Sequence, residues 1–349
     1  MRKLYFLFII SIFFSQDFDD LNFGTDSSLD VITWNIEWFP KNGQTTVDYV
    51  SEIILALDAD IIAMQELSDT VLFNQMINNL EGYHGYYESS WFAGLAYIYK
   101  SETIEINNIF EIYTTSQYWS PFPRSPMVMD MSFMNENYLI INNHFKCCGD
   151  DVLDSNNDND EEMRRFIASS LLKEYIDSYY PDSRVIVLGD LNDSLTDAWN
   201  NNVFQMFLDD QNNFMFTDMQ IAEGNVSSWS FPNWPSHIDH ILITNELFEM
   251  FENNNSYCET ILIDEFMDGG FYDYDQNISD HRPVGLHLFA QPTISGDLNG
   301  DEQVDVLDVI IVVNIILDDE SPDFMADLNN DGMINVVDVL LIVNLILGN

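Results

Sequence analysis

Short apolar segments alternate with helical segments from residue 29 to about residue 287, and this alternation constrains the fold more than any other feature. Two segments, 46–57 and 161–180, have helical periodicity. Short apolar runs with polar ends, typical of strands, occupy 30–39, 59–67, 95–100, 127–133, 138–145, 184–193, 237–244 and 283–289. Strands of mixed direction covered by a few helices predict an α/β sandwich of roughly 260 residues.

The composition supports a large core and limits the classes of function. Of 349 residues, 46% are apolar and 14% aromatic, which excludes disorder throughout the chain. The 11 Lys and Arg residues face 59 Asp and Glu residues, so the formal charge is −48. Proteins that bind nucleic acid electrostatically neutralise phosphates with Lys and Arg. If this chain acts on phosphates, bound cations must therefore supply the positive charge.

The first 16 residues predict a secretory signal peptide. Arg2 and Lys3 precede an apolar run from Leu4 to Phe14, followed by Ser15 and Gln16. The alternative is a buried N-terminal strand. These eleven residues are too few to span a bilayer. We therefore expect a secreted, extracellular protein with no stable transmembrane segment after signal cleavage.

A second domain, residues 297–349, is expected after a linker at 290–296 that contains Pro, Ser, Thr and Gly. This domain has 12 acidic residues and no Lys or Arg. It repeats itself at an offset of 30 residues. The four polar positions of the first copy and their counterparts in the second are Asp297, Asn299, Asp301 and Asp308, and Asp327, Asn329, Asp331 and Asp338.

The spacing of these side chains predicts two calcium sites. They occupy positions 1, 3, 5 and 12 of a loop that leads into a helix, which is the order in which a 12-residue loop supplies oxygen ligands to Ca²⁺. Gln303 and Met333 at position 7 would donate backbone carbonyls. Unlike the helix–loop–helix calcium hand, each loop has Asp at position 12 and no entering helix is expected. The alternative is an acidic tail with apolar helices.

A loop plus a single helix, present twice, resembles a type I dockerin. The resemblance implies a small all-α, calcium-binding domain that docks to a cohesin-like protein, which would attach the secreted chain to a cell surface or an assembly. It places positions 10 and 11 of each loop at the contact; these are Val306, Leu307, Val336 and Val337. Their side chains predict an apolar contact, whereas many dockerins carry hydroxyl groups there.

In the large domain, polar side chains follow apolar runs, where strand ends converge. Glu66, helped by Asn35 and Asp280, could bind a divalent metal that keeps other positions for water or phosphate oxygens, as Mg²⁺ (or Mn²⁺) does. Hydrolysis of a phosphoester also needs a base, and His281 oriented by Asp239 fits that role. His144 could stabilise or protonate the phosphoester on the side opposite His281.

The segments "WNIEW", "QE", "NNH", "GDLND", "IDHI" and "SDH", in this order, resemble the endonuclease/exonuclease/phosphatase superfamily over residues 29 to 289. The resemblance implies a four-layer α/β sandwich, two mixed β-sheets flanked by helices. It implies that Asp190 activates or positions the attacking water and that Asn192 holds a phosphate oxygen. Arg124, in "FPRSP", resembles an arginine of the family that contacts the phosphate.

We therefore expect a secreted metal-dependent phosphodiesterase whose substrate is extracellular nucleic acid, cut as by an endonuclease. Trp229 and Trp234 could stack on bases, or they could anchor a loop. A sphingomyelinase-like phospholipase C is the enzymatic alternative, with 269–275 as a candidate apolar loop. The second alternative is a non-catalytic, calcium-dependent assembly module. Cys147, Cys148 and Cys258 allow one long-range bridge, a vicinal thiol pair, or packing alone.

Overall fold

A computed structural model describes residues 18, 20–89, 91–290, 296–299, 303–318, 326–329 and 333–347. The chain divides into two compact units, Met1–Ala290 and Gln291–Asn349. The expected signal peptide at 1–16 and residues 291–295 of the expected linker lie outside the described residues.

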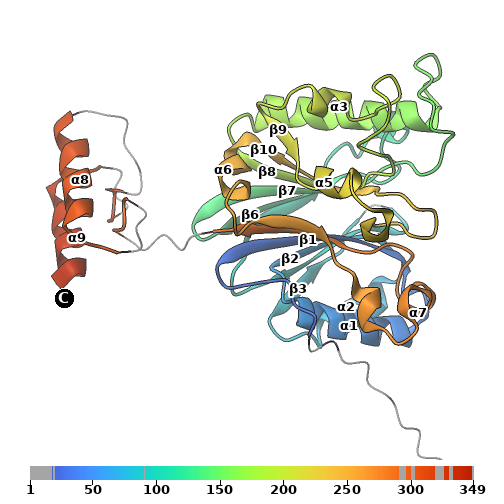
Figure 1. Cartoon of the computed structure of the whole chain (residues 1–349), viewed down its shortest axis with the longest axis horizontal. Coiled ribbons are helices and arrows are strands. Elements are labelled where there is room, and N and C mark those ends of the chain that lie inside the picture. Colours follow the sequence, from blue (N-terminus) through green and yellow to red (C-terminus); the bar gives the residue numbers. More distant parts are fainter. Residues whose placement is uncertain are drawn as a thin grey trace, which may run out of the picture. The chain divides into compact units, whose positions relative to one another are not determined.

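The N-terminal unit contains two six-stranded mixed sheets (Figure 1). In order across the first sheet, the strands are β11 (Tyr257–Thr260), β12 (Val284–Phe289), β1 (Ser28–Phe39), β2 (Ile61–Leu67), β4 (Gly94–Lys100) and β3 (Tyr83–Tyr86). In order across the second, they are β5 (Glu105–Glu111), β6 (Met127–Phe133), β7 (Glu136–His144), β8 (Arg184–Asp190), β10 (Asp239–Thr244) and β9 (Phe214–Phe216). Strands β1 and β2 are parallel, as are β7 and β8, whereas the other pairs are antiparallel.

Helices cover the outer face of each sheet, so the unit has four layers (Figure 1). The first sheet carries α1 (Gln44–Leu57), α2 (Thr70–Ile77) and α7 (Gly270–Asn277). The second carries α3 (Glu161–Tyr179). The shorter helices are η1 (Ser116–Tyr118), α4 (Gln205–Leu208), α5 (Met219–Ala222), η2 (Val226–Ser228), η3 (Asn245–Leu247), α6 (Phe248–Phe251) and η4 (Ile263–Phe266). Among the described residues, the search for a helix capable of crossing a membrane found none.

The alternation of side chains along each strand separates the interior into three apolar clusters. In β1, Leu29 and Val31 face the second sheet, whereas Ile32 and Trp34 face the helices. The cluster between the sheets is therefore enclosed on both sides by pleated backbone. This arrangement confirms the predicted four-layer sandwich.

The structure also corrects the sequence analysis at the sheet edges and at residues 269–275. Strands β3, β5, β9 and β11 were not predicted, because each is short or half-exposed and lacks a buried apolar run. The segment 269–275, a candidate apolar loop for the phospholipase alternative, lies mostly in helix α7. Its Tyr274 is fully buried, and only Tyr272 is strongly exposed, at 74%.

The C-terminal unit contains α8 (Val306–Asp318) and α9 (Val336–Leu347). They pack through a small cluster centred on Val312, Ala326 and Ile342. Asp301 and Asp331 of the expected calcium loops lie outside the described residues. The unit is helical, as predicted.

A tyrosine of the first sheet connects the two sheets through its hydroxyl group. The Tyr97 hydroxyl lies 2.8 Å from the Met127 carbonyl and 3.0 Å from the Ile140 carbonyl, and it accepts from the Asn142 N–H at 3.0 Å. Tyr97 is fully buried on β4, whereas its three partners belong to β6 and β7. The hydroxyl therefore satisfies backbone groups of the opposite sheet that water cannot reach.

Replacing Tyr97 with Phe is expected to lower the free energy of unfolding by about 1–3 kcal/mol, the cost of leaving buried backbone groups unsatisfied. Urea unfolding of the purified protein measures this change. Tyr99→Phe on the same strand is the matched control, because its side chain is partly exposed. Equal stability of the two variants would contradict this role of the Tyr97 hydroxyl.

Candidate active site

The polar side chains predicted for the site lie at or beside one edge of the sandwich, and both sheets contribute them. In the second sheet, His144 at the end of β7 is in register with Asp190 at the end of β8, and Asp190 is in register with Asp239 at the start of β10. In the first sheet, Asn35 on β1 is in register with Gln65, the residue before Glu66 on β2. The strand directions therefore bring carboxylates and imidazoles together at this edge.

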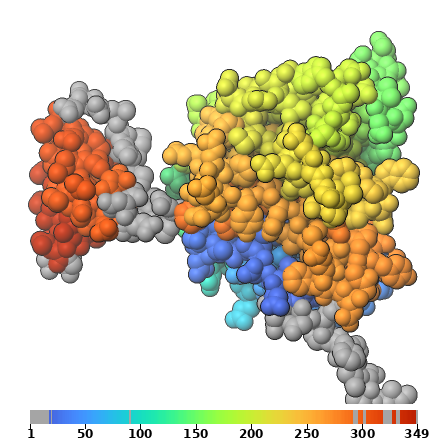
Figure 2. Space-filling model, in the orientation of Figure 1, coloured from blue at the N-terminus to red at the C-terminus, as the bar shows by residue number. Residues whose placement is uncertain are grey.

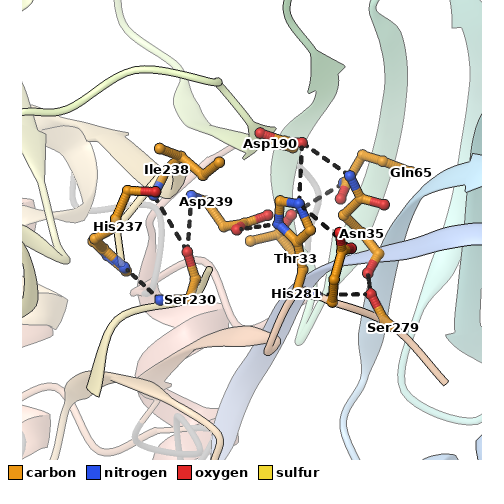
Figure 3. Close-up of polar contacts among 12 residues, drawn as sticks. Thr33, Asn35, Gln65, Asp190, Ser230, His237, Ile238, Asp239, Ser279 and His281 are labelled. Atoms are coloured by element: carbon orange, nitrogen blue, oxygen red, sulfur yellow. Dashed lines mark hydrogen bonds and ion pairs between the residues drawn. The ribbon is translucent and has the colours of Figure 1, made fainter. Parts of the chain in front are cut away.

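A direct hydrogen bond joins the two sheets within the site. Asn35 Nδ2 donates to Asp190 Oδ2 at 2.9 Å, and both side chains are buried (Figure 3). The other amide atom of Asn35, Oδ1, accepts from the Glu37 N–H at 3.0 Å. Ser279 Oγ donates to the Asn35 carbonyl at 2.7 Å and accepts from the His281 N–H at 3.0 Å. One strand thus orients groups from both sheets and from the segment before β12.

Glu66 stands at an irregularity of the first sheet. Its φ of +65° is in the left-handed region, and the pairing of β2 with β4 shifts register between Met64 and Leu67. Such a conformation costs about 1–3 kcal/mol in a residue other than glycine and is found preferentially at functional sites. Glu66 Oε2 accepts from the Trp38 N–H at 3.1 Å, while Oε1 lies 3.9 Å from His144 Nε2. The bulge therefore directs a carboxylate toward the second sheet.

His281 is surrounded by carboxylates. Its Nδ1 lies 2.8 Å from Asp239 Oδ2, and its Nε2 lies 3.9 Å from Asp190 Oδ2 (Figure 3). The same Nε2 lies 3.9 Å from Asp280 Oδ1. Burial lowers the pKa of His281, but the charges of Asp239 and Asp190 outweigh burial and raise it to about 10. These carboxylates therefore favour the protonated form of the imidazole at neutral pH. Phe231 packs against this ring, with centroids 4.7 Å apart.

His144 has the opposite tendency. Burial, together with the charges of Arg124 and His281, lowers its pKa well below the usual value. Its Nε2 lies 3.5 Å from Asp190 Oδ2, and its Nδ1 is a buried atom without a hydrogen-bond partner among the described residues. A neutral His144 therefore faces the same carboxylate as the protonated His281.

The acidic groups of the site hold protons more tightly than usual. Burial raises the pKa of Asp190 to about 7, although the charge of His281 opposes it. Burial likewise raises the pKa of Glu66, against the charges of Arg124 and His281, and burial with Glu37 raises the pKa of Asp280 to about 6. Neighbouring buried carboxylates that resist ionisation are stabilised by a cation.

Arg124 and Asn192 also belong to this edge. Arg124 influences both Glu66 and His144 electrostatically, and its Nε donates to the Ala93 carbonyl at 3.3 Å. The Asn192 N–H donates to Asp190 Oδ1 at 3.1 Å, with its own φ at +56°. All nine side chains predicted for the site therefore lie at or beside this edge.

The donor set fits a hard divalent cation. Asn35, Glu66 and Asp280 offer amide and carboxylate oxygens, which Mg²⁺ and Mn²⁺ prefer. Ligand atoms of Asp190, Asp239 and His281 also lie within 4.8 Å of one another. However, the His281–Asp239 hydrogen bond already engages two of these three side chains. The oxygen-rich side near Glu66 is therefore the better match for a metal.

Two groups that support the site were not identified from the sequence. Glu37 Oε2 accepts from the Asp280 N–H at 2.8 Å and pairs with Lys41, which also lies 2.9 Å from Asp275 Oδ1. Beneath the site, Gln65 Nε2 donates to Asn142 Oδ1 at 2.8 Å, joining the sheets a second time. Glu37 lies within the "WNIEW" segment, so its acidic side chain in that motif could have indicated its place in the site.

A buried ion pair lies behind Asp239. Asp218 Oδ2 accepts from His240 Nδ1 at 2.6 Å and from His237 Nε2 at 2.9 Å. The second nitrogen of His240, Nε2, lies 2.8 Å from the Asp193 carbonyl, which can only accept. Both ring nitrogens of His240 therefore donate, so the ring is a cation.

The three cysteines are free thiols, so the long-range bridge considered from the sequence is absent from the described residues. Cys147 and Cys148 are exposed, and Cys258 is half-buried. The Sγ atoms of Cys147 and Cys148 lie 2.9 Å apart.

Comparisons with known proteins agree with the resemblances found in the sequence. The Endonuclease/Exonuclease/phosphatase family model matches residues 32–281, and the Dockerin type I domain model matches residues 295–347. No curated protein sequence matches the chain.

Several solved structures share the sandwich fold. One is TDP2 of D. rerio complexed with a single strand DNA product, with 13% identity and a TM-score of 0.54 over 75% of this chain and 99% of that one. Another is the endonuclease/exonuclease/phosphatase from Bacteroides vulgatus, with 15% identity and a TM-score of 0.53 over 76% and 99% of the two chains. The human Nocturnin catalytic domain with bound sulfate anion has 18% identity and a TM-score of 0.53 over 75% and 93%. At these identities the similarity establishes the fold.

The His240–Asp218 pair predicts a pH-dependent contribution to stability. Burial lowers the pKa of His240, but Asp218 outweighs burial and raises it above the ordinary 6.5. Burial raises the pKa of Asp218, but His240 and His237 lower it below the ordinary 3.8. The pair therefore makes its full contribution to the free energy of unfolding between about pH 4 and pH 6.5. Its contribution is lost as pH rises through the folded pKa of His240 or falls through that of Asp218.

Urea unfolding of wild type and His240→Gln as a function of pH measures this contribution. Between pH 4 and 6.5 we expect the free energy of unfolding of the variant to be about 3–5 kcal/mol lower than that of wild type, as for a broken buried ion pair. In alkaline solution we expect a smaller difference. The exposed His84→Gln serves as control. A difference between wild type and His240→Gln that does not change with pH would show that His240 is uncharged in the folded protein.

Proposed function

The chain belongs to the endonuclease/exonuclease/phosphatase family, and on this premise we propose that it is an exported, divalent-metal-dependent phosphodiesterase that hydrolyses extracellular nucleic acid. The observation that carries the proposal is the convergence of carboxylates, amides and two histidines at one edge of the sandwich. The surroundings favour the protonated form of one histidine and the neutral form of the other. That set contains a cation binder, a proton acceptor and proton donors, which are the groups that phosphodiester hydrolysis requires.

Glu66, with Asn35 and Asp280, would hold the metal. When bound, a divalent cation polarises a phosphoryl oxygen and neutralises charge that develops there. The family fold supports metal dependence, and so does the accumulation of buried acids that resist ionisation. Because the chain carries so few Lys and Arg residues, a cation at this position would supply the charge that its own side chains lack.

The remaining side chains would bind and move protons. Asn192 would donate to a phosphate oxygen, and His144, kept neutral, would donate Nε2–H on the other side. The sequence suggested His281 as the base that removes a proton from the attacking water. The carboxylates around His281 favour a different division of work: His281 donates to the phosphate as a cation held by Asp239, while Asp190 accepts the proton of water.

Exposed aromatic side chains support nucleic acid as the substrate. Trp38, whose N–H contacts Glu66, has a side chain 52% exposed, and its ring lies 5.9 Å from that of Phe92, which is 74% exposed. Trp234 is 80% exposed, between Phe231 and Ser236, which form a bridge next to His281. Stacking on bases supplies affinity without positive charge. Trp229 instead donates to the Ile221 carbonyl at 3.1 Å, so it anchors the loop.

The alternatives have less support. A sphingomyelinase-like activity would need an apolar surface for lipid, and the segment considered for it is a helix that directs Tyr274 into the core. A non-catalytic assembly module would not require the buried acidic residues to be retained together. We therefore keep both as outcomes of the experiment below.

The C-terminal unit would attach the enzyme to a cohesin-bearing partner. Type I dockerins bind cohesins and calcium, and the oxygen donors of this unit fit calcium. Asp308 and Asp338 are fully buried, and Asp338 Oδ1 has no hydrogen-bond partner among the described residues. Val306 and Val336 at position 10 of the loops are 63% and 65% exposed, as a contact surface requires. We propose export on the basis of the signal-peptide pattern in residues 1–16.

Removal of the His281 imidazole tests the proposed site. We expect His281→Ala to lower kcat for bis-p-nitrophenyl phosphate with Mg²⁺ at least about a hundredfold, within the usual effect of a positioned acid or base. His84→Ala is the matched control, because His84 is exposed and stacks on Tyr99 away from the site. Wild-type turnover by a folded His281→Ala protein would refute the assignment.

The same proteins with plasmid DNA and with sphingomyelin, each with Mg²⁺, Ca²⁺ or chelator, identify the substrate class. Metal-dependent DNA cleavage that His281→Ala lacks supports a nuclease. Turnover of sphingomyelin alone favours the phospholipase, and no turnover of any substrate favours the assembly module.

The aromatic pair beside Glu66 predicts a binding effect on single-stranded DNA. We expect Trp38→Ala and Phe92→Ala each to raise KM about tenfold with little change in kcat, because one stacked base contributes about 1–3 kcal/mol. Tyr179→Ala is the control, since this 72% exposed aromatic ends α3 at the opposite edge of the sandwich. An unchanged KM in both aromatic variants would remove stacking from the proposal.

A further inference from the structure

The segment between β7 and α3 is the most acidic part of the N-terminal unit outside the active site. Residues 150–162 contain seven Asp or Glu residues and no Lys or Arg. Figure 2 shows this segment in green, projecting from the surface beside α3. It starts six residues after His144, so its conformation affects the position of the backbone that follows this active-site residue.

Three of these carboxylates converge from the two ends of the segment. Asp150 lies near its start, whereas Asp160 and Glu162 lie at the beginning of α3. One oxygen of each lies within 4.8 Å of the others. Asp160 caps the helix, since its Oδ1 accepts from the Met163 N–H at 2.9 Å and from the Asp154 N–H at 3.2 Å. Helix capping accounts for Asp160 but not for the two carboxylates beside it.

Glu162 provides an independent sign of a ligand. The residue is only 2% exposed. Its Oε1 accepts from the Asp151 N–H at 2.9 Å, but its Oε2 is a buried atom with no hydrogen-bond partner among the described residues. Gly149 covers the carboxylate so closely that a Cβ at this position would lie 2.0 Å from Oε1. A buried carboxylate oxygen without a donor is costly unless a cation binds it.

The guanidinium that pairs with Glu162 does not provide that cation. Arg165 Nη2 lies 3.2 Å from Glu162 Oε1, but its Nε donates to Asp193 Oδ2 at 2.7 Å. Its Nη1 donates to the carbonyls of Lys146 and Cys148 at 2.8 and 2.7 Å. Arg165 is thus shared between two carboxylates and does not reach Glu162 Oε2, so the cluster keeps a surplus of negative charge.

We propose that Asp150, Asp160 and Glu162 form a calcium site that fastens the segment after His144 to the start of α3. Three carboxylates, of which Asp150 is exposed and Asp160 half-exposed, suit Ca²⁺, which takes six to eight oxygen ligands in flexible geometry and completes them with water. The site is separate from the metal position at Glu66 and from the loops of the C-terminal unit. Bound Ca²⁺ would hold the active-site rim through Gly149 and Arg165.

Hydrogen exchange of the full chain tests this site locally. Amide exchange in residues 149–163 is followed in chelator and in excess Ca²⁺, with Mg²⁺ present in both arms to occupy the position at Glu66. At a Ca²⁺ concentration one hundred times the dissociation constant, exchange through opening of the site is expected to slow about a hundredfold. Peptides of the C-terminal unit, which has its own calcium loops, report whether Ca²⁺ was available.

Glu162→Gln and Asp150→Asn are each expected to abolish this protection while leaving the C-terminal response intact. Asp158→Asn, an exposed carboxylate of the same segment, is the matched control and keeps the protection. Because Asp150 is exposed, its variant tests the site even if Glu162→Gln folds poorly. Absence of protection at 149–163 while the C-terminal unit responds overturns the proposal. An equal loss in Asp158→Asn also overturns it, by showing diffuse attraction of cations to an acidic segment.

Discussion

The hydrogen bond from Asn35 to Asp190 is the contact on which the rest of the site depends. The hydrophobic effect that packs the two sheets together is non-directional, so it does not by itself select one geometry for the polar groups at their edge. A buried amide that donates to a buried carboxylate has one acceptable geometry and a high penalty when broken. Together with Gln65 to Asn142 and the hydroxyl of Tyr97, it fixes the register of one sheet on the other.

That fixed register explains how an acidic protein can assemble a site for an anionic substrate. The sandwich edge gathers several carboxylates where burial makes each one hard to ionise, and it places them next to two imidazoles whose surroundings differ. His281 is charged because three carboxylates face it, and His144 is neutral because it is enclosed. The same residue type thus has two different pKa shifts because of burial and neighbouring charge.

Much of the fold followed from the sequence, because the central strands are buried on both faces and leave continuous apolar runs. The edge strands could not be predicted: β5, for example, has no fully buried residue and no distinctive pattern. Helix α7 begins with Gly270 and is rich in Asp and Tyr, so local propensity favoured a loop, whereas burial of Tyr274 decided the outcome. Propensity is a weak guide where one aromatic anchor dominates.

The site residues were predictable one strand at a time, since each follows an apolar run, and the Asp239–His281 pair was expected, but the contacts between the two sheets were not. Nothing local to Asn35 indicates Asp190 on the other sheet, and nothing local to His240 indicates Asp218. Glu162 was equally hidden, because its partners come from the far end of a loop. Contacts between separate segments depend on the register of whole elements, which periodicity does not encode.

One feature of the first sheet ties the active-site segment to the apolar core. The Tyr274 hydroxyl donates to the His281 carbonyl at 2.6 Å and accepts from Trp34 Nε1 at 2.9 Å, and both aromatic side chains are fully buried. The backbone that carries the imidazole is thus fastened to the same cluster that holds the helices to the sheet. The segment that carries His281 is therefore held by the core at this point. Heat inactivation and global unfolding should then occur as a single cooperative event.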